Sequence, residues 1–139
     1  MNTLIEQLMT DEGRIMKNGR HICYQDSEGI WTVGYGRNIQ ERGLSEEEAQ
    51  MLLRNDIVSA IDDLMDNFSW FPHVGPTRQE VFINMMFNLG LDKFKEFRRM
   101  IAAAEIGDYE QVAVEMMDSK WARQVGERAV RLRDKMLAG

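Results

Sequence analysis

The sequence is poor in the residues that build disulfides and zinc sites. It contains one cysteine, Cys23, so an internal disulfide is impossible, and its two histidines, His21 and His73, lie far apart. We therefore expect no metal site and no other cofactor. No segment approaches the roughly 18 consecutive apolar residues of a membrane-spanning helix, so membrane insertion is not expected either.

The N-terminus, "MNTLIEQLMTDEG", has no basic segment followed by a long apolar run, so no signal peptide is predicted and we expect a protein made in the cytoplasm. The chain also lacks an excess of positive charge. Its 17 basic and 23 acidic residues give a formal net charge of −6. This balance disfavours nucleic-acid binding, which rewards positive charge. The length of 139 residues fits a single domain with a core of its own.

What the sequence does contain is a short β region after a first helix. Thr3 and Glu6 have the spacing of a helix-capping box, and the apolar residues of 4–9 lie on one helical face that ends near Gly13. Asn18-Gly19 between two apolar runs is a strong hairpin signal. With the run "GIWTVGYG", residues 14 to about 39 are predicted to form one antiparallel meander.

From Ser45 onward the pattern is helical. A capping box at Ser45 and Glu48 opens a helix to about residue 67, and Thr77 with Glu80 opens another that ends at Gly90. Three more helices are expected near 93–105, 108–118 and 123–137. The predicted fold is α+β, with a β lobe over about 13–44, a connecting helix over about 45–67, and a helical lobe of 1–12 and 68–139. The first helix is expected to pack on that helical lobe.

Two carboxyl groups are candidates for chemistry. Glu12 ends the first helix, and the hairpin returns the chain so that Asp26 can face it. Glycoside hydrolysis needs two such groups, one to protonate the leaving oxygen and one to activate water or attack. A structural role is the alternative, in which Asp26 caps the turn "DSEG" and Glu12 is a solvated helix end.

Two further side chains could assist this pair. Thr32, six residues after Asp26, could hold a water that Asp26 activates, or it could simply fill a strand position. Arg128 could hydrogen-bond Glu12 and orient it, or it could be a surface arginine.

The ordered set of motifs resembles the phage-type lysozymes of glycoside hydrolase family 24. The pieces are Glu12-Gly13, "YQDSEGIWTVGYG" at 24–36, "NMMFNLG" at 84–90, "GDYEQVA", "SKW" at 119–121 and "QVGERAVR" at 124–131. They follow the family order over nearly the whole chain.

The resemblance implies a muramidase that hydrolyses the β-1,4 bond between N-acetylmuramic acid and N-acetylglucosamine in peptidoglycan. Glu12 matches the general acid, Asp26 the second carboxylate, Thr32 the hydroxyl of the site, and Arg128 an arginine near the acid. It also implies that the glycan strand is the partner and that a holin releases the protein to the wall. We expect a monomer. The positions that would bind sugar are Glu28, Asn38, Asn84, Phe87, Asn88, Phe97 and Glu115.

The sequence departs from the family in several ways, including changed residue types at the sugar-binding positions Asn38, Phe97 and Glu115. The loop from Glu12 to Asp26 is about five residues longer, around "KNGRH", and we read this as a lengthened hairpin. Arg37 replaces a histidine and could pair with an acid in or just before the connecting helix. The chain is acidic where many relatives are basic, so weaker wall binding is expected. A non-catalytic glycan-binding domain and a lytic transglycosylase remain alternatives, and the stereochemical outcome stays open.

Overall fold

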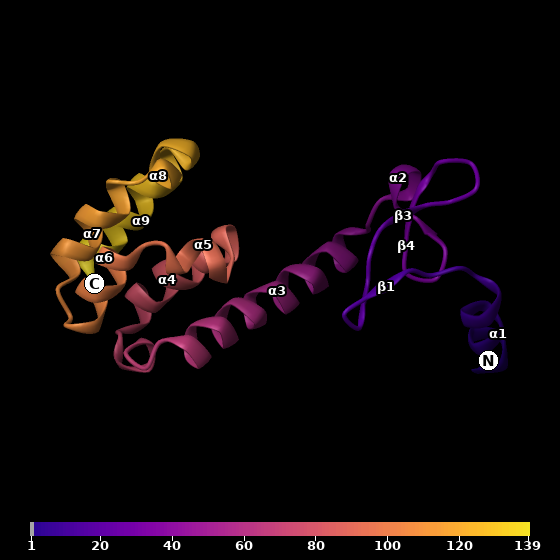
Figure 1. Ribbon diagram of the computed structural model, residues 1–139, viewed down its shortest axis with the longest axis horizontal. Helices are drawn as coiled ribbons and strands as arrows, with labels where there is room; N and C mark the ends of the chain where they lie inside the picture. The colour runs from indigo at the N-terminus through magenta and orange to yellow at the C-terminus, as the bar shows by residue number, and fades with distance from the viewer. Residues whose placement is uncertain (1) are drawn as a thin grey trace. The chain divides into compact units, whose positions relative to one another are not determined.

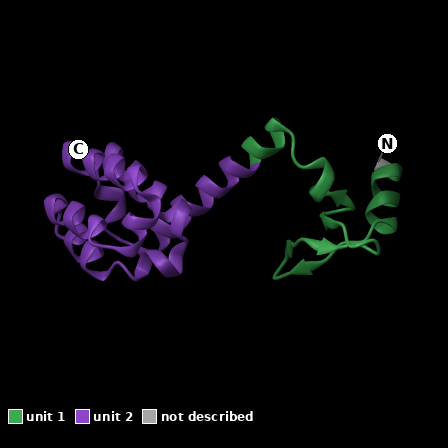
Figure 2. Cartoon of the chain, turned by 90° about the horizontal axis from the view of Figure 1, so that it is seen from above, with its two compact units in different colours: residues 1–51 green, residues 52–139 purple. Residues whose placement is uncertain are grey.

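The computed structural model describes residues 2–139, and the chain divides into two compact units, residues 1–51 and residues 52–139 (Figures 1 and 2). The boundary falls inside the long helix α3 (Glu46–Asn67). The chain is mostly helical with small antiparallel sheets, and this confirms the predicted α+β, lysozyme-like class.

The first unit carries all the strands that the structure describes. Its elements are α1 (Asn2–Asp11), β1 (Met16–Lys17), β2 (Arg20–His21), β3 (Tyr24–Gln25), β4 (Trp31–Val33), β5 (Arg37–Asn38) and the short helix α2 (Ile39–Arg42). The predicted turn at Asn18-Gly19 is present, with both residues at positive φ (52° and 75°), as a two-residue hairpin turn requires.

The single predicted meander is wrong in its connectivity. β1 pairs only with β2, whereas β3, β4 and β5 form a separate three-stranded sheet. The change of partner occurs between His21 and Tyr24, where the chain leaves the ribbon and begins to pair with β4. α2 was not predicted. It begins after Asn38, whose side-chain Oδ1 accepts the Glu41 N–H at 2.9 Å and so caps the helix.

The first unit has almost no core of its own. In its described part, Thr32 is the one residue that is less than a tenth exposed. α1 begins at Asn2, so Thr3 lies inside the helix rather than in front of it. The apolar face of α1 is exposed by 43–59% at Leu4, Ile5, Leu8 and Met9. Packing of α1 on the helical lobe stays a prediction.

The second unit contains the hydrophobic core. After α3 come the 3₁₀ turn η1 (Phe71–His73) and the helices α4 (Pro76–Leu89), α5 (Leu91–Lys95), α6 (Arg98–Glu105), α7 (Tyr109–Met117), α8 (Lys120–Val125) and α9 (Glu127–Ala138). α9 lies beside α4, α7 and α8. Met85, Met100, Met116 and Met136 are all fully buried, and their flexible side chains suit the irregular gaps between short helices.

Three helix predictions need correction. The stretch 93–105 is broken after Lys95, and the stretch 123–137 is broken at Gly126, whose φ of 56° does not fit a continuous helix. α4 does not start with a capping box at Thr77. Its N-cap is Gly75, and Pro76 occupies the first turn, where its missing N–H costs nothing. The Ser45–Glu48 box is confirmed, with Glu48 N–H to Ser45 Oγ at 3.1 Å and Ser45 N–H to Glu48 Oε1 at 2.8 Å.

Candidate active site

Glu12 lies just beyond α1 and against the turn between β4 and β5. A Cβ atom placed on Gly36 would be only 2.6 Å from Glu12 Oε2, so the carboxyl group rests directly on the glycine backbone. Tyr24 fixes the neighbouring residue, since its hydroxyl donates to the carbonyl of Gly13 at 2.7 Å. Glu12 and the residue after it are therefore attached at two points to the three-stranded sheet.

Asp26 closes the turn between β3 and β4. Its Oδ1 accepts the N–H groups of Glu28 at 2.8 Å and of Ile30 at 3.0 Å. The turn-capping role considered from the sequence is therefore real. Both of these bonds use Oδ1, so the role leaves Oδ2 as the oxygen that could meet a water or a substrate.

Strand register brings Asp26 and Thr32 to one face of this sheet. Tyr24 is opposite Thr32, Thr32 is opposite Asn38, and Asp26 N–H donates to the Ile30 carbonyl at 2.9 Å. Because side chains alternate along a strand, Asp26, Thr32 and Asn38 share a face. Thr32 is 5% exposed, and its hydroxyl donates to the Ile30 carbonyl at 3.0 Å. Its oxygen keeps lone pairs that can accept a further hydrogen bond.

Apart from Glu28, which lies in the turn between β3 and β4, the remaining predicted residues lie in the second unit. Arg128 Nε donates to Asn84 Oδ1 at 2.9 Å, so the arginine is held by α4. Trp121 Nε1 donates to Asn88 Oδ1 at 2.8 Å. An orienting contact between Arg128 and Glu12 would join residues of different units and stays a prediction.

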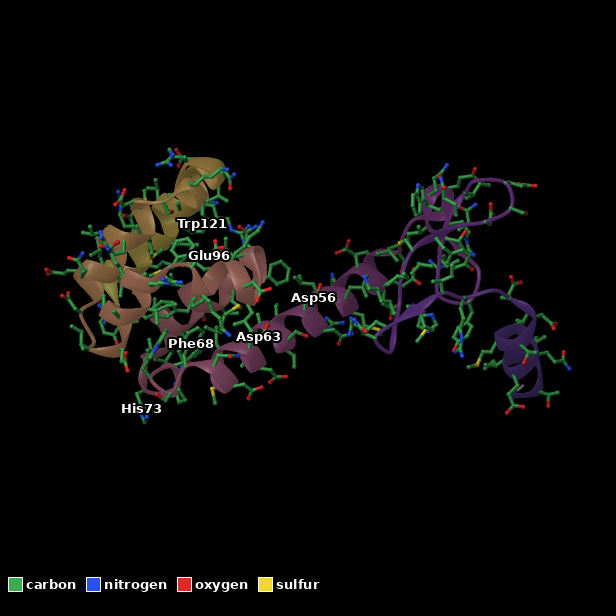
Figure 3. All side chains as sticks on the ribbon, viewed as in Figure 1. Asp56, Asp63, Phe68, His73, Glu96 and Trp121 are labelled. Carbon is green, nitrogen blue, oxygen red and sulfur yellow. The ribbon has the colours of Figure 1, made fainter. Side chains whose placement is uncertain are left out.

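Phe97 and Glu115 line one cavity of about 620 Å³, whose walls come from α5, α6, α7 and α8. Trp121 forms part of its wall, and its ring meets Phe97 edge-on at 6.2 Å. Figure 3 labels Trp121 and Glu96, both of which line this cavity. The other lining residues are Leu89, Lys93, Arg98, Arg99, Met100, Asp118, Ser119, Lys120 and Gln124.

Phe87 lies elsewhere, in a smaller cavity of about 390 Å³. Asp56 and Asp63, labelled on α3 in Figure 3, also line it. Of the predicted sugar-binding set, Phe97 and Glu115 therefore share a cavity, whereas Phe87 belongs to another.

Arg37 pairs with Glu48, as expected for the residue that replaces the family histidine. Arg37 Nη1 is 3.0 Å from Glu48 Oε1, and Nη2 is 2.5 Å from Oε2. The hydrogen bonds from Arg37 and from the Ser45 N–H lower the pKa of Glu48 to about 2. The pair ties β5 to the first turn of α3 within the first unit.

Tyr35, in the turn that contacts Glu12, was not identified from the sequence. Tyr35 precedes Gly36, its hydroxyl accepts from Arg14 Nη1 at 3.0 Å, and its ring meets His21 edge-on at 5.0 Å. The alternation of "GIWTVGYG" places Tyr35 on a strand face but cannot show what it touches.

Across residues 2–139, no group of three or more His, Cys, Asp and Glu side chains is placed to hold a metal ion. In that same part of the chain, none of the helices combines the length and the apolarity needed to cross a membrane.

Comparison with known families settles the family. The model of the phage lysozyme family matches residues 16–136. The chain belongs to the phage lysozyme family. This assignment supports a glycosidase of the lysozyme type acting on peptidoglycan.

Among curated proteins, this lysozyme-family chain is 26% identical to the pre-baseplate central spike protein Gp5 of Enterobacteria phage T4 over 165 residues, covering 99% of this chain and 28% of that protein. It is 21% and 22% identical to the probable T4-type lysozymes 2 and 1 of Dictyostelium discoideum, over 95% of this chain and 92% of each relative. The chain thus spans about a quarter of the spike protein but nearly all of the Dictyostelium proteins. These alignments extend over more than 139 residues, so the relatives contain residues that this chain lacks.

Proposed function

We propose that this member of the phage lysozyme family is a muramidase. It hydrolyses the β-1,4 bond between N-acetylmuramic acid and N-acetylglucosamine in bacterial peptidoglycan, and its biological role is host-cell lysis after a holin opens the membrane. The observation that carries the proposal is the arrangement in the first unit. Glu12 lies against Gly36 at one turn of the sheet that presents Asp26 and Thr32 on one face.

Glu12 acts as the general acid. It donates its carboxyl proton to the glycosidic oxygen as the bond to the anomeric carbon breaks. Contact with Gly36 and the Tyr24–Gly13 hydrogen bond support this role, because a proton donor has to be held at a fixed distance from the leaving oxygen.

Asp26 and Thr32 position and activate the water. The water donates one hydrogen to Asp26 Oδ2 and the other to Thr32 Oγ1, so its lone pair points at the anomeric carbon. The hydrogen bonds of both side chains support this role. The Asp26 carboxylate is fixed through Oδ1 by two backbone N–H groups, and the Thr32 hydroxyl uses its own hydrogen on the Ile30 carbonyl. Thr32 can then only accept a hydrogen bond from the water, as this geometry requires.

Arg128 is proposed to orient Glu12, and the glycan is proposed to contact the remaining predicted positions. Those positions are Glu28, Asn38, Asn84, Phe87, Asn88, Phe97 and Glu115. The side-chain Oδ1 of Asn38 already caps α2, and its Nδ2 donates one hydrogen to Glu41 Oε2 at 3.2 Å. The second hydrogen of this amide is the group that remains for a sugar.

The test compares clearance of peptidoglycan suspensions by the wild type, Glu12→Gln and Asp26→Asn. Both substitutions keep the size of the side chain, and the amide oxygen introduced by Asp26→Asn can still accept the two turn N–H groups. Matched controls are Glu6→Gln and Asp11→Asn, which remove exposed carboxyl groups from α1, the helix that precedes Glu12.

Loss of clearance in both site variants, with both controls active, is the expected result. Full clearance by Glu12→Gln or Asp26→Asn would refute the two-carboxylate mechanism. Loss of clearance by Glu12→Gln alone would favour a lytic transglycosylase, which needs a single acid.

A further inference from the structure

The β1–β2 ribbon extends from the rest of residues 1–51 (Figure 2). Beyond the paired strands, Ile22 N–H donates to the Ile15 carbonyl at 3.0 Å, so the ribbon continues to the 15–22 pair. It contains the longer loop that distinguishes this sequence from the family pattern. Its two faces differ in what they contact.

One face is fixed to the turn that holds Glu12. Met16 is opposite His21, and by alternation Arg14 lies on the same face. His21 and Arg14 both contact Tyr35, the residue before Gly36, through the 5.0 Å ring contact and the 3.0 Å hydrogen bond. The ribbon is thus anchored beside Glu12.

The opposite face is open and positively charged. It consists of Ile15, Lys17, Arg20 and Ile22, which we call the outer face. Lys17 and Arg20 are directly opposite each other, an arrangement of like charges that destabilises a strand pair. Within the described part of the chain, neither belongs to a salt bridge. Ile15 and Ile22 are 45% and 38% exposed.

The local charge contrasts with that of the whole chain. Residues 13–25 contain three cations and no acid, although the chain has a formal net charge of −6. A cationic pair flanked by two exposed isoleucines is complementary to an extended peptide that carries carboxylates and methyl groups.

We propose that the outer face binds the stem peptide of peptidoglycan, with Lys17 and Arg20 on its carboxylates and Ile15 and Ile22 on its alanine methyl groups. This inference rests on the proposed muramidase function. The length of the ribbon suits a stem peptide, because the four steps along the chain from Gly13 to Lys17 cover about 13 Å in a strand. A stem peptide of four residues, attached to N-acetylmuramic acid, extends over about the same distance. A sugar at Glu12 therefore has its peptide within reach of the ribbon.

The test uses the double variant Lys17→Gln/Arg20→Gln on two substrates, intact peptidoglycan and glycan strands stripped of stem peptides by an amidase. The measured quantity is kcat/KM from the release of reducing ends. We expect the ratio of kcat/KM on intact over stripped substrate to fall about three- to tenfold, since each exposed ion pair contributes little. The control is Arg131→Gln/Lys135→Gln, which removes one arginine and one lysine from the exposed side of α9 and should leave the ratio unchanged.

An unchanged ratio in the ribbon variant, or an equal fall in the control, would overturn the proposal. The two proposals fail separately. If the wild type releases no reducing ends, the muramidase proposal fails, and NMR titration with soluble N-acetylmuramyl tetrapeptide still decides the second one. Shifts of the amides of residues 15–22 in the wild type that disappear in the ribbon variant would support peptide binding. The absence of such shifts in the wild type would overturn it.

Discussion

Replacing Gly36 with alanine should displace the general acid without unfolding the protein. The new Cβ would lie 2.6 Å from Glu12 Oε2 and 3.0 Å from its Cδ. The carboxyl group must move by about 0.9 Å to restore an ordinary separation of about 3.5 Å. The atoms that must move belong to the end of a flexible side chain, so the clash adds little to the stability cost. Misplacement of a catalytic group by about 1 Å can cost 100-fold in rate, so we expect kcat to fall roughly 10- to 100-fold.

Gly34→Ala is the matched control. Gly34 lies in the same turn and also has positive φ, 65° against 77° for Gly36, but a Cβ there would meet nothing within 4 Å. Both variants should lose about 1–2 kcal/mol of stability from the left-handed backbone, measured by thermal unfolding. Only Gly36→Ala should lose kcat on peptidoglycan. An equal loss of kcat in the two variants would refute the reasoning that Gly36 supports the Glu12 carboxyl group.

Two other predictions concern polar contacts. The hydrogen bonds that Glu48 accepts from Arg37 and Ser45 lower its pKa from 4.5 to about 2. The charged carboxylate therefore stabilises the fold above about pH 4.5, and this stabilisation is lost as the pH falls through about 2. The difference in melting temperature between wild type and Glu48→Gln should therefore shrink over that range, and a constant difference would contradict it. Asn88→Ala leaves the indole N–H of Trp121, a residue that is 4% exposed, without its partner, and should cost about 1–3 kcal/mol in urea unfolding. Asn88→Asp, which keeps an acceptor, should cost less.

Local signals predicted the first unit well where one residue pair decides the structure. Asn18-Gly19 predicted its hairpin, and Ser45 with Glu48 predicted the start of α3. In each case the residues form the turn or the cap through their own backbone angles and hydrogen bonds. The pairing of Arg37 with an acid of the connecting helix was also predicted, and the structure identifies that acid as Glu48.

The wrong predictions concern strand pairing and helix boundaries, which depend on contacts between residues far apart in the sequence. Residues 20–25 form one continuous extended run in the sequence, and only the pairing of β3 with β4 shows that the sheet is interrupted. Thr77 and Glu80 have the spacing of a capping box, but Pro76 starts α4 before them. Periodicity could not show that Gly126 adopts positive φ and divides a helix.

The sequence predicted which residues belong to the candidate site, but it did not predict their contacts. Spacing and resemblance identified Glu12, Asp26 and Thr32, whereas contact of Glu12 with Gly36 depends on a close approach that has no sequence signal. The structure also showed that the turn-capping role of Asp26 is compatible with chemistry, because the two roles use different oxygens.

The most direct test of the muramidase assignment is the mass spectrum of products formed from purified peptidoglycan in ¹⁸O-labelled water. Hydrolysis with water activated by Asp26 and Thr32 predicts reducing N-acetylmuramic acid ends that carry one ¹⁸O atom, and the Glu12→Gln variant should form none. Anhydromuramic acid ends without label, or intact glycan strands with the wild type, would contradict the account.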